Sequence, residues 1–82
     1  MDHKLQILER IQTIFRRELN DETLQISYKS STSTVENWDS MNNLILISAI
    51  ESEFDVSFPI EIIFNAENVG DLCDYILLLK NK

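Results

Sequence analysis

The stretch that decides the fold is WDSMNNLILISAIESEF, residues 38–54. On a helical wheel, its apolar side chains divide between two faces. The first face holds the residues that we expect in the core: Leu46, Ile47, Ile50 and Phe54. The second face holds Met41, Leu44 and Ile45, beside Ser40. Because a helix in a small domain cannot easily bury both faces, we expect the second to form an exposed surface for a partner.

Polar residues mark both ends of this helix. Either Asp39 or Ser40 can cap its start, because each side chain can accept a hydrogen bond from an unpaired backbone N–H of the first turn. Residues 55–59 end the helix and turn the chain. The acidic residues near this end are expected to form an ordinary solvated helix end: they are Glu51, Glu53 and Asp55.

Upstream, residues 5–19 predict another amphipathic helix. Apolar side chains recur there at helical spacing, with polar side chains between them. The apolar set is Leu5, Leu8, Ile11, Phe15 and Leu19, joined by Ile7 and Ile14.

Residues 20–39, which join these two helices, lose the helical pattern and are rich in Ser and Thr. A connection of this length in a compact domain is normally functional or attached to the core. The residues able to attach it are Leu24, Ile26, Tyr28, Val35 and Trp38. The alternation of Leu24, Ile26 and Tyr28 also permits a short strand, but no partner strand is visible in the sequence. We therefore predict a long loop.

Two further helices are expected downstream. Pro59 suits the first position of a short helix whose apolar residues are Ile60, Ile62, Ile63 and Phe64. Asn68 is expected to cap the last helix, with Asp71 favouring its positive end. The apolar stripe of this helix is Val69, Leu72, Cys73, Ile76 and Leu79. The predicted fold is all-α, a small four-helix bundle of three main helices and one short helix, with residues 1–82 as a single domain.

The composition excludes several classes of function. The chain has 82 residues, 14 acidic and 7 basic, and a formal net charge of −7, which disfavours nucleic acid and anionic membrane surfaces as partners. One cysteine cannot form an internal disulfide framework. No apolar stretch approaches the roughly 20 residues of a membrane span, and the N-terminus lacks the apolar core of a secretory signal. We therefore expect a cytoplasmic protein.

Few residues are able to carry catalysis. His3, the one histidine, is remote in sequence from the Asp39-Ser40 pair, so a hydrolytic triad would need the N-terminus to fold over that serine. With Gly70 as the one glycine, a Gly-rich phosphate loop is excluded. Cys73 lies on an apolar stripe and is expected to pack as a small hydrophobe. We expect neither an enzyme nor a metal site.

Asp39-Ser40-Met41 alone would be ordinary helix capping, but its surroundings change the interpretation. A long loop precedes it, a helix with a spare apolar face follows it, and the chain is strongly acidic. With these features the chain resembles the acyl carrier protein family, in which Asp-Ser-Leu or Asp-Ser-Met opens the second helix. Further similar segments extend the resemblance over nearly the whole chain: Glu51–Val56, Phe58-Pro59, Asn68-Val69 and Asp74–Ile76.

The resemblance implies a stand-alone carrier whose Ser40 hydroxyl receives 4′-phosphopantetheine, with Asp39 and Met41 as the flanking motif. Acyl or aminoacyl groups would be held on this arm as thioesters. The implied partners are a phosphopantetheinyl transferase, an acyl-loading ligase or synthase, and a downstream acyltransferase or synthase, and the carrier would be a monomer. Family members commonly shield their cargo between the second and third helices. The residues similar in position to that cleft are Ile45, Phe58, Ile62 and Ile63.

The chain departs from the carriers of fatty acid synthesis, which usually have acidic residues on the first turns of the second helix. Here residues 41–50 carry no charge, and the first acid is Glu51. Recognition should therefore depend on apolar contact and amide hydrogen bonds, through a partner surface of Met41, Leu44, Ile45 and Ser48. Two further departures precede Ser40: Trp38 stands before the Asp where the family usually has a small residue, and Asn37 stands where Gly is frequent. Together with the uncharged stretch, they resemble stand-alone carriers of specialised biosynthetic pathways.

Two alternatives from other classes remain open. The first is an interaction module that is never modified and binds a partner helix through Met41, Leu44 and Ile45. The second is a small hydrolase that uses Ser40 as its nucleophile, although a suitably placed base is missing.

Overall fold

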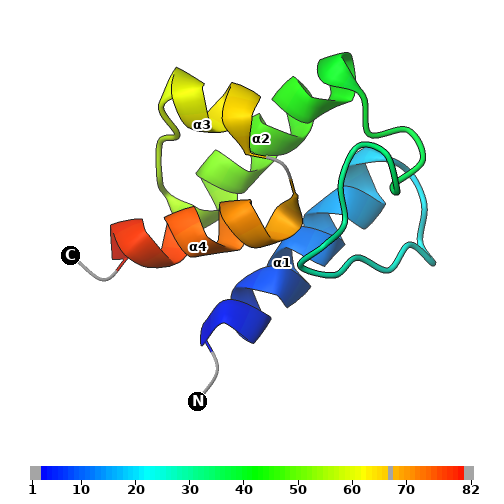
Figure 1. Ribbon diagram of the computed structural model, residues 1–82. Helices are drawn as coiled ribbons and strands as arrows, with labels where there is room; N and C mark the ends of the chain where they lie inside the picture. The colour runs from blue at the N-terminus through cyan, green and yellow to red at the C-terminus, as the bar shows by residue number, and fades with distance from the viewer. Residues whose placement is uncertain (1–2, 67, 81–82) are drawn as a thin grey trace.

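The computed structural model describes residues 3–66 and 68–80, which form four α-helices and, within these ranges, no strand. The helices are α1 (His3–Glu18), α2 (Ser40–Phe54), α3 (Ile60–Asn65) and α4 (Val69–Lys80). Figure 1 shows α4 lying across α1, with α2 and the short α3 on the side of α4 away from the N-terminal end of α1. The predicted all-α bundle of three main helices and one short helix is confirmed.

The core lies where α1 packs against both α2 and α4. Its buried helical side chains are Ile7, Ile11, Ile14 and Phe15 of α1, Leu46, Ile47, Ile50 and Phe54 of α2, and Val69, Leu72, Cys73 and Ile76 of α4. The core face predicted for α2 is thus correct. The stripe predicted for α1 is wrong at one end: Leu5 is 45% exposed, because Ile7, Ile11 and Ile14 form the face that meets the core.

The acidic residues at the end of α2 do more than face solvent, which corrects the expectation from sequence. A carboxylate oxygen of Glu51 accepts a hydrogen bond from the backbone N–H of Phe58 at 2.6 Å. Glu53 pairs with Arg10 of α1 at 2.6 Å, and the same guanidinium lies 4.4 Å from the ring centre of Phe54. Asp55 adopts the left-handed conformation that ends the helix, with φ 55°. These contacts fix the turn into α3 and hold α2 against α1.

Residues 19–39, between α1 and α2, lack regular structure but are attached to the core as predicted. Ile26, Val35 and Trp38 are buried, and Leu24 and Tyr28 pack partly against the core. Two side chains of α1 also form hydrogen bonds with backbone groups of this loop. Arg16 donates to the carbonyl of Leu24 at 2.6 Å, and the Gln12 side chain accepts from the N–H of Ile26 at 2.9 Å.

The same loop docks on the start of α4. The first N–H groups of a helix have no partner within it, and here two of them donate to loop carbonyls: Val69 to Ser30 at 2.9 Å and Gly70 to Tyr28 at 2.7 Å. A Cβ at position 70 would lie 2.9 Å from the carbonyl oxygen of Tyr28, so glycine permits this approach. Docking at this point fixes the loop residues that follow it.

The caps of the two later helices were predicted with different success. The Asn68 side chain accepts from the N–H of Asp71 at 2.9 Å, which confirms the predicted cap of α4. Pro59 precedes α3 rather than being its first residue, because its ψ of 156° is extended. Its carbonyl still accepts from Ile62 and Ile63. None of the helices formed by the described residues is both long and apolar enough to cross a membrane.

Candidate functional site

The site predicted from sequence lies at the start of α2. Asp39 has an extended backbone, and its carboxylate accepts a hydrogen bond from the N–H of Asn42 at 2.9 Å, so it is the N-cap. Its carbonyl accepts from the N–H of Asn43 at 2.8 Å. Of the two residues considered as caps, Asp39 therefore fills this role, and Ser40 is the first residue of the helix. An anionic group attached at this position would be favoured by the helix dipole.

The residues just before the site are held in place by a second set of contacts. The Asn42 side chain donates to the carbonyl of Asn37 at 2.7 Å, and Asn37 adopts a left-handed conformation with φ 71°. Trp38 is 7% exposed and packs edge-on against Phe15 of α1, with 5.0 Å between ring centres. The loop therefore reaches α2 along a defined path.

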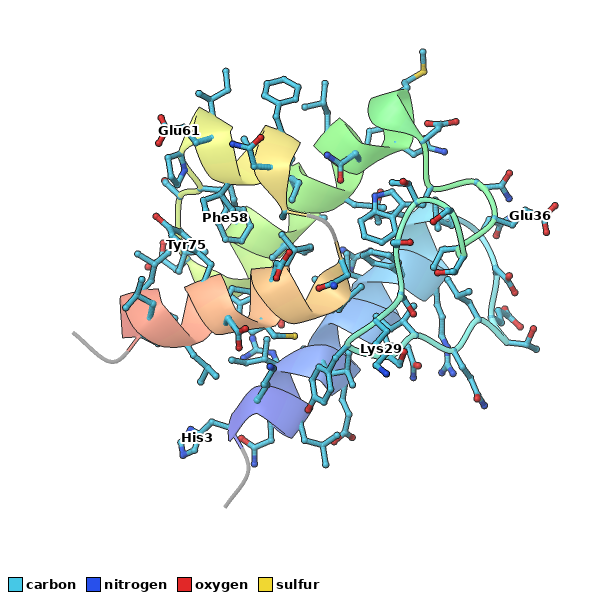
Figure 2. All side chains as sticks on the ribbon, in the orientation of Figure 1. His3, Lys29, Glu36, Phe58, Glu61 and Tyr75 are labelled. Atoms are coloured by element: carbon cyan, nitrogen blue, oxygen red, sulfur yellow. The ribbon has the colours of Figure 1, made fainter. Side chains whose placement is uncertain are left out.

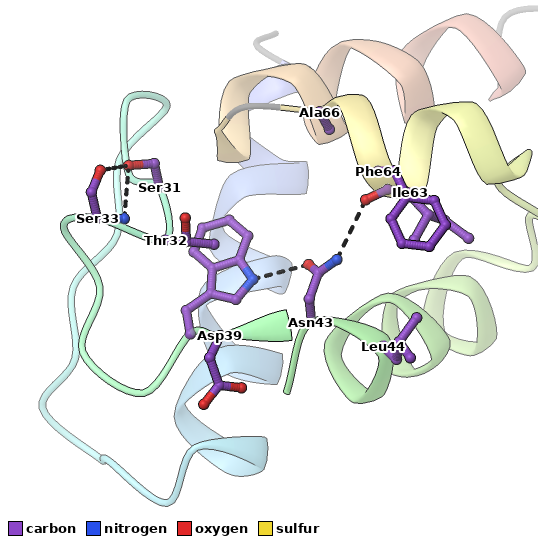
Figure 3. A pocket seen from close by; sticks show the side chains of 10 residues that line it. Ser31, Thr32, Ser33, Asp39, Asn43, Leu44, Ile63, Phe64 and Ala66 are labelled. Atoms are coloured by element: carbon purple, nitrogen blue, oxygen red, sulfur yellow. Dashed lines mark hydrogen bonds between the residues drawn. The ribbon is translucent and has the colours of Figure 1, made fainter. Parts of the chain in front are cut away.

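A groove of about 910 Å³ opens beside the start of α2. Figure 3 shows residues from three segments around it: the loop, the first turns of α2, and α3. Its lining residues are Ser31, Thr32, Ser33, Trp38, Asp39, Asn43, Leu44, Ile63, Phe64 and Ala66. The loop contributes hydroxyl groups, whereas Leu44 and α3 contribute apolar surface. The groove thus combines a polar wall with an apolar wall.

The four residues that the family resemblance places near the cleft lie in different surroundings. Ile63 lines the groove, but Phe58 is buried and stacks at a tilt on Tyr75, with 5.5 Å between ring centres (Figure 2). Ile62 lines a separate depression between α3 and α4, and Ile45 lies on another face of α2. Other residues that line the groove were not predicted, because their place beside the start of α2 depends on how the loop and α3 pack. These residues are Ser31, Thr32, Ser33, Asn43 and Phe64.

The second face of α2 is exposed, as the helical wheel predicts. Met41 is 76% exposed, Leu44 55% and Ile45 48%. Ser48 is also exposed, and it lines a shallow depression with Leu44 and Ile45. The structure thus brings together the four residues predicted as a partner surface. Phe64 of α3 adds exposed apolar surface to the groove, and Ile60 is a second exposed apolar side chain of α3.

The structure offers no support for the hydrolase alternative. His3 lies at the far end of the molecule from the start of α2 (Figures 1 and 2). Across the described residues, no group of three His, Cys, Asp or Glu side chains is placed to hold a metal ion. Cys73 is fully buried, and burial raises the pKa of its thiol to about 11, with Lys4 lowering it by a smaller amount. This thiol is therefore protonated at neutral pH and packs as the predicted hydrophobe.

Comparison with known proteins identifies the family. Residues 9–76 match the family model described as "Phosphopantetheine attachment site". The chain is 35% identical to an acyl carrier protein of Cyanidioschyzon merolae over 72 residues, 88% of this chain and 79% of that protein. This chain belongs to the acyl carrier protein family. The resemblance noted in the sequence is thereby confirmed, and the chain is a carrier protein rather than an enzyme.

Other members of the family agree in sequence and in fold. An acyl carrier protein of Caulobacter vibrioides is 31% identical to the carrier over 70 residues, 85% of this chain and 90% of that protein. The solution structure of a holo acyl carrier protein from Geobacter metallireducens superimposes with a TM-score of 0.81 at 26% identity. The match covers 92% of this chain and 88% of the other.

Membership of this family makes 4′-phosphopantetheine the covalent cofactor of the carrier. The residues beside the start of α2 fit this group. Hydroxyl groups of Ser31, Thr32 and Ser33 are suited to the hydroxyl and amide groups of such an arm, and the apolar wall at Leu44 and Phe64 is suited to an acyl chain. When attached, the cofactor supplies a thiol on a flexible arm, a group that buried Cys73 cannot provide.

Proposed function

We propose that this chain carries acyl or aminoacyl groups as thioesters on a 4′-phosphopantetheine arm attached to Ser40, with Asp39 and Met41 as the flanking motif. The observation that carries the proposal is the position of Ser40, the first residue of α2, directly after the N-cap Asp39 and inside the matched region 9–76. The proposal takes residues 1–82 as one carrier domain that acts as a monomer in the cytoplasm.

The local chemistry supports attachment at this residue. A phosphodiester there would lie within the first turn of α2, whose unpaired N–H groups and dipole favour negative charge. Within that turn α2 has no acidic side chain to repel the phosphate. The carboxylate of Asp39 is engaged by the N–H of Asn42, which partly compensates its charge.

The chain also needs partner enzymes. A phosphopantetheinyl transferase would attach the arm, a ligase or synthase would load it, and a downstream acyltransferase or synthase would unload it. We propose that they contact the α2 surface of Met41, Leu44, Ile45 and Ser48. This surface is apolar and uncharged although the chain carries a net charge of −7. Apolar side chains and hydrogen-bonding groups are the partner chemistry that fits it. Such a surface favours enzymes of a specialised pathway over enzymes of fatty acid synthesis, which bind their carriers through basic docking sites.

Mass spectrometry tests the attachment site. The purified chain is incubated with coenzyme A and a promiscuous phosphopantetheinyl transferase, and its intact mass is compared with that of the Ser40→Ala variant. We expect a gain of one phosphopantetheinyl group in the wild type and none in the variant. Ser57→Ala, an exposed serine outside the helices, is the matched control and should still be modified. A wild-type chain that gains no mass would favour the unmodified interaction module, and a modified Ser40→Ala chain would refute the site.

Modification rates test the proposed surface. Replacing Leu44 with Ser should leave the fold intact, because this side chain is 55% exposed, and should slow modification about tenfold if its contact area is lost in the complex. Leu78→Ser on α4, at 59% exposure, is the matched control and should be modified at the wild-type rate. Equal rates for both variants would remove the α2 surface from the proposal while leaving Ser40 as the site.

A further inference from the structure

The side chain of Asn43 lies between three parts of the site. It is on the first turns of α2, and its amide contacts the loop on one side and α3 on the other (Figure 3). Its Oδ1 accepts a hydrogen bond from the indole Nε1–H of Trp38 at 2.9 Å. Its Nδ2 donates to the backbone carbonyl of Ile63 at 3.4 Å.

The indole fixes the orientation of this amide. Trp38 is 7% exposed, and its ring nitrogen is a donor that needs an acceptor when it is buried. Asn43 must therefore turn its oxygen toward Trp38, which turns its NH₂ group toward α3. The contact between Trp38 and Phe15 holds the indole against α1, so the amide is fixed relative to the core.

On the other side, α3 packs on the core through partly buried side chains, Ile62 and Ile63. It is six residues long, and within it no side chain is fully buried. Helices this short are marginally stable by themselves, and the carbonyls of their last turn have no partner inside the helix. The carbonyl of Ile63 lies in that last turn and receives the Asn43 donor. The bond thus joins the apolar wall of the groove to a fixed point on α2.

We propose that Asn43 is a positioning residue, which holds the α3 wall of the groove at a set distance from α2 and couples it to Trp38, two residues before the attachment site. Any cargo that displaces α3 must stretch or break the Asn43–Ile63 bond. Asn43 thereby limits how far the groove opens. Describing the groove as the cargo site rests on the proposed function, whereas the coupling of α3, Asn43 and Trp38 belongs to the unmodified chain.

Three substitutions separate the Asn43 bond to α3 from its bond to Trp38 in the loop. Asn43→Asp keeps an acceptor for Trp38 but replaces the donor to Ile63 with a second acceptor. Asn42→Asp adds the same charge one residue earlier and loses the donor to the loop carbonyl of Asn37 instead of the donor to α3, and both aspartates favour the positive end of α2. Asn43→Leu has a similar size and loses both bonds.

Amide and indole hydrogen exchange of the unmodified chain, measured by NMR, tests the proposal. In Asn43→Asp we expect the α3 amides to exchange about fivefold faster than in Asn42→Asp, as loss of one hydrogen bond predicts, with no change at the Trp38 indole. In Asn43→Leu the indole should also exchange faster. A general loss of stability would instead speed exchange in α1 and α4 as well. That pattern, or equal α3 exchange in the two aspartate variants, would overturn the proposal.

Repeating the comparison in the Ser40→Ala background separates this inference from the proposed function. The difference between the two aspartate variants should persist there, because the coupling needs no arm. A failure to modify Ser40 would therefore leave the exchange test valid, and a failed exchange test would leave the attachment site unaffected.

Discussion

Replacing Gly70 with Ala provides the sharpest test of how the loop is positioned. The effect combines two opposed contributions. Gly70 has a negative φ within α4, so helix propensity alone predicts that Ala stabilises the fold by about 1 kcal/mol. The new Cβ, however, would lie 2.9 Å from the carbonyl oxygen of Tyr28 and 3.3 Å from its Cβ. Rotation of the Tyr28 side chain moves neither its carbonyl oxygen nor its Cβ, so the contact cannot be relieved in that way. The loop must therefore shift.

The cost of that shift exceeds the gain in propensity. Overpacking of this kind costs about 1–3 kcal/mol. Moving the loop also weakens the hydrogen bonds from Gly70 to Tyr28 and from Val69 to Ser30, each with a net contribution of about 1 kcal/mol. If the two bonds together lose about 1 kcal/mol, subtracting the gain in propensity leaves an expected fall in the free energy of unfolding of about 1–3 kcal/mol. For a domain of this size, 1 kcal/mol corresponds to a decrease in Tm of roughly 4–8 °C.

Urea denaturation followed by circular dichroism and by Trp38 fluorescence measures this change. Ser52→Ala is the control, because it places Ala at an exposed helical position and should change stability by a few tenths of a kcal/mol. If the docking explanation is correct, Gly70→Ala also speeds hydrogen exchange in residues 26–33. A Gly70→Ala chain more stable than the wild type by about 1 kcal/mol would refute the steric argument.

Three further predictions follow from single contacts. Asp39→Ala should lower the free energy of unfolding by about 1 kcal/mol in urea denaturation, because it removes the N-cap of α2. Asp39→Asn keeps a capping oxygen and should change it little. Equal effects of the two substitutions would contradict the cap. Arg10→Met should lower it by about 0.5–1 kcal/mol at low salt and less at high salt, unlike Arg17→Met, whose ion pair lies within α1. Burial raises the pKa of Cys73 from 9.0 to about 11, so between these pH values the folded chain keeps a proton that the unfolded chain loses. The free energy of unfolding should therefore fall as pH rises from about 9 to 11. The slope of this fall against pH should be smaller in Cys73→Ala.

The sequence predicted those features that depend on local pattern. The two faces of α2, the cap at Asn68 and the burial of Cys73 follow from spacing or from chemistry within one turn, and the structure agrees with them. Leu5 was misplaced because two overlapping stripes are possible on α1, and packing against α4 and α2 decides between them. Periodicity within one helix does not contain that information.

The lining of the groove depends on contacts between distant parts of the chain, which is why it was largely missed. Ser31 to Ser33 reach the start of α2 because Tyr28 and Ser30 dock on α4, some forty residues later in the sequence. Asn43 lies in the uncharged stretch 41–50, and its role is visible only when Trp38 and Ile63 lie on either side of it. A buried indole followed five residues later by an amide was the available signal.

The placement of charge bears on how partners approach and bind the carrier. The Lys and Arg side chains of α1 are engaged by other groups of the chain: Lys4 pairs with Asp74, Arg10 with Glu53 and Arg17 with Glu18, and Arg16 binds a loop carbonyl. The net charge of −7 produces a long-range negative field around the molecule, while residues 41–50 are uncharged. A field of this kind affects how often a basic partner arrives, whereas apolar contact affects how long it stays. If partners dock on α2 as proposed, attraction and discrimination are separate: enzymes with a positive surface would approach the carrier, and those with an apolar face complementary to α2 would remain bound.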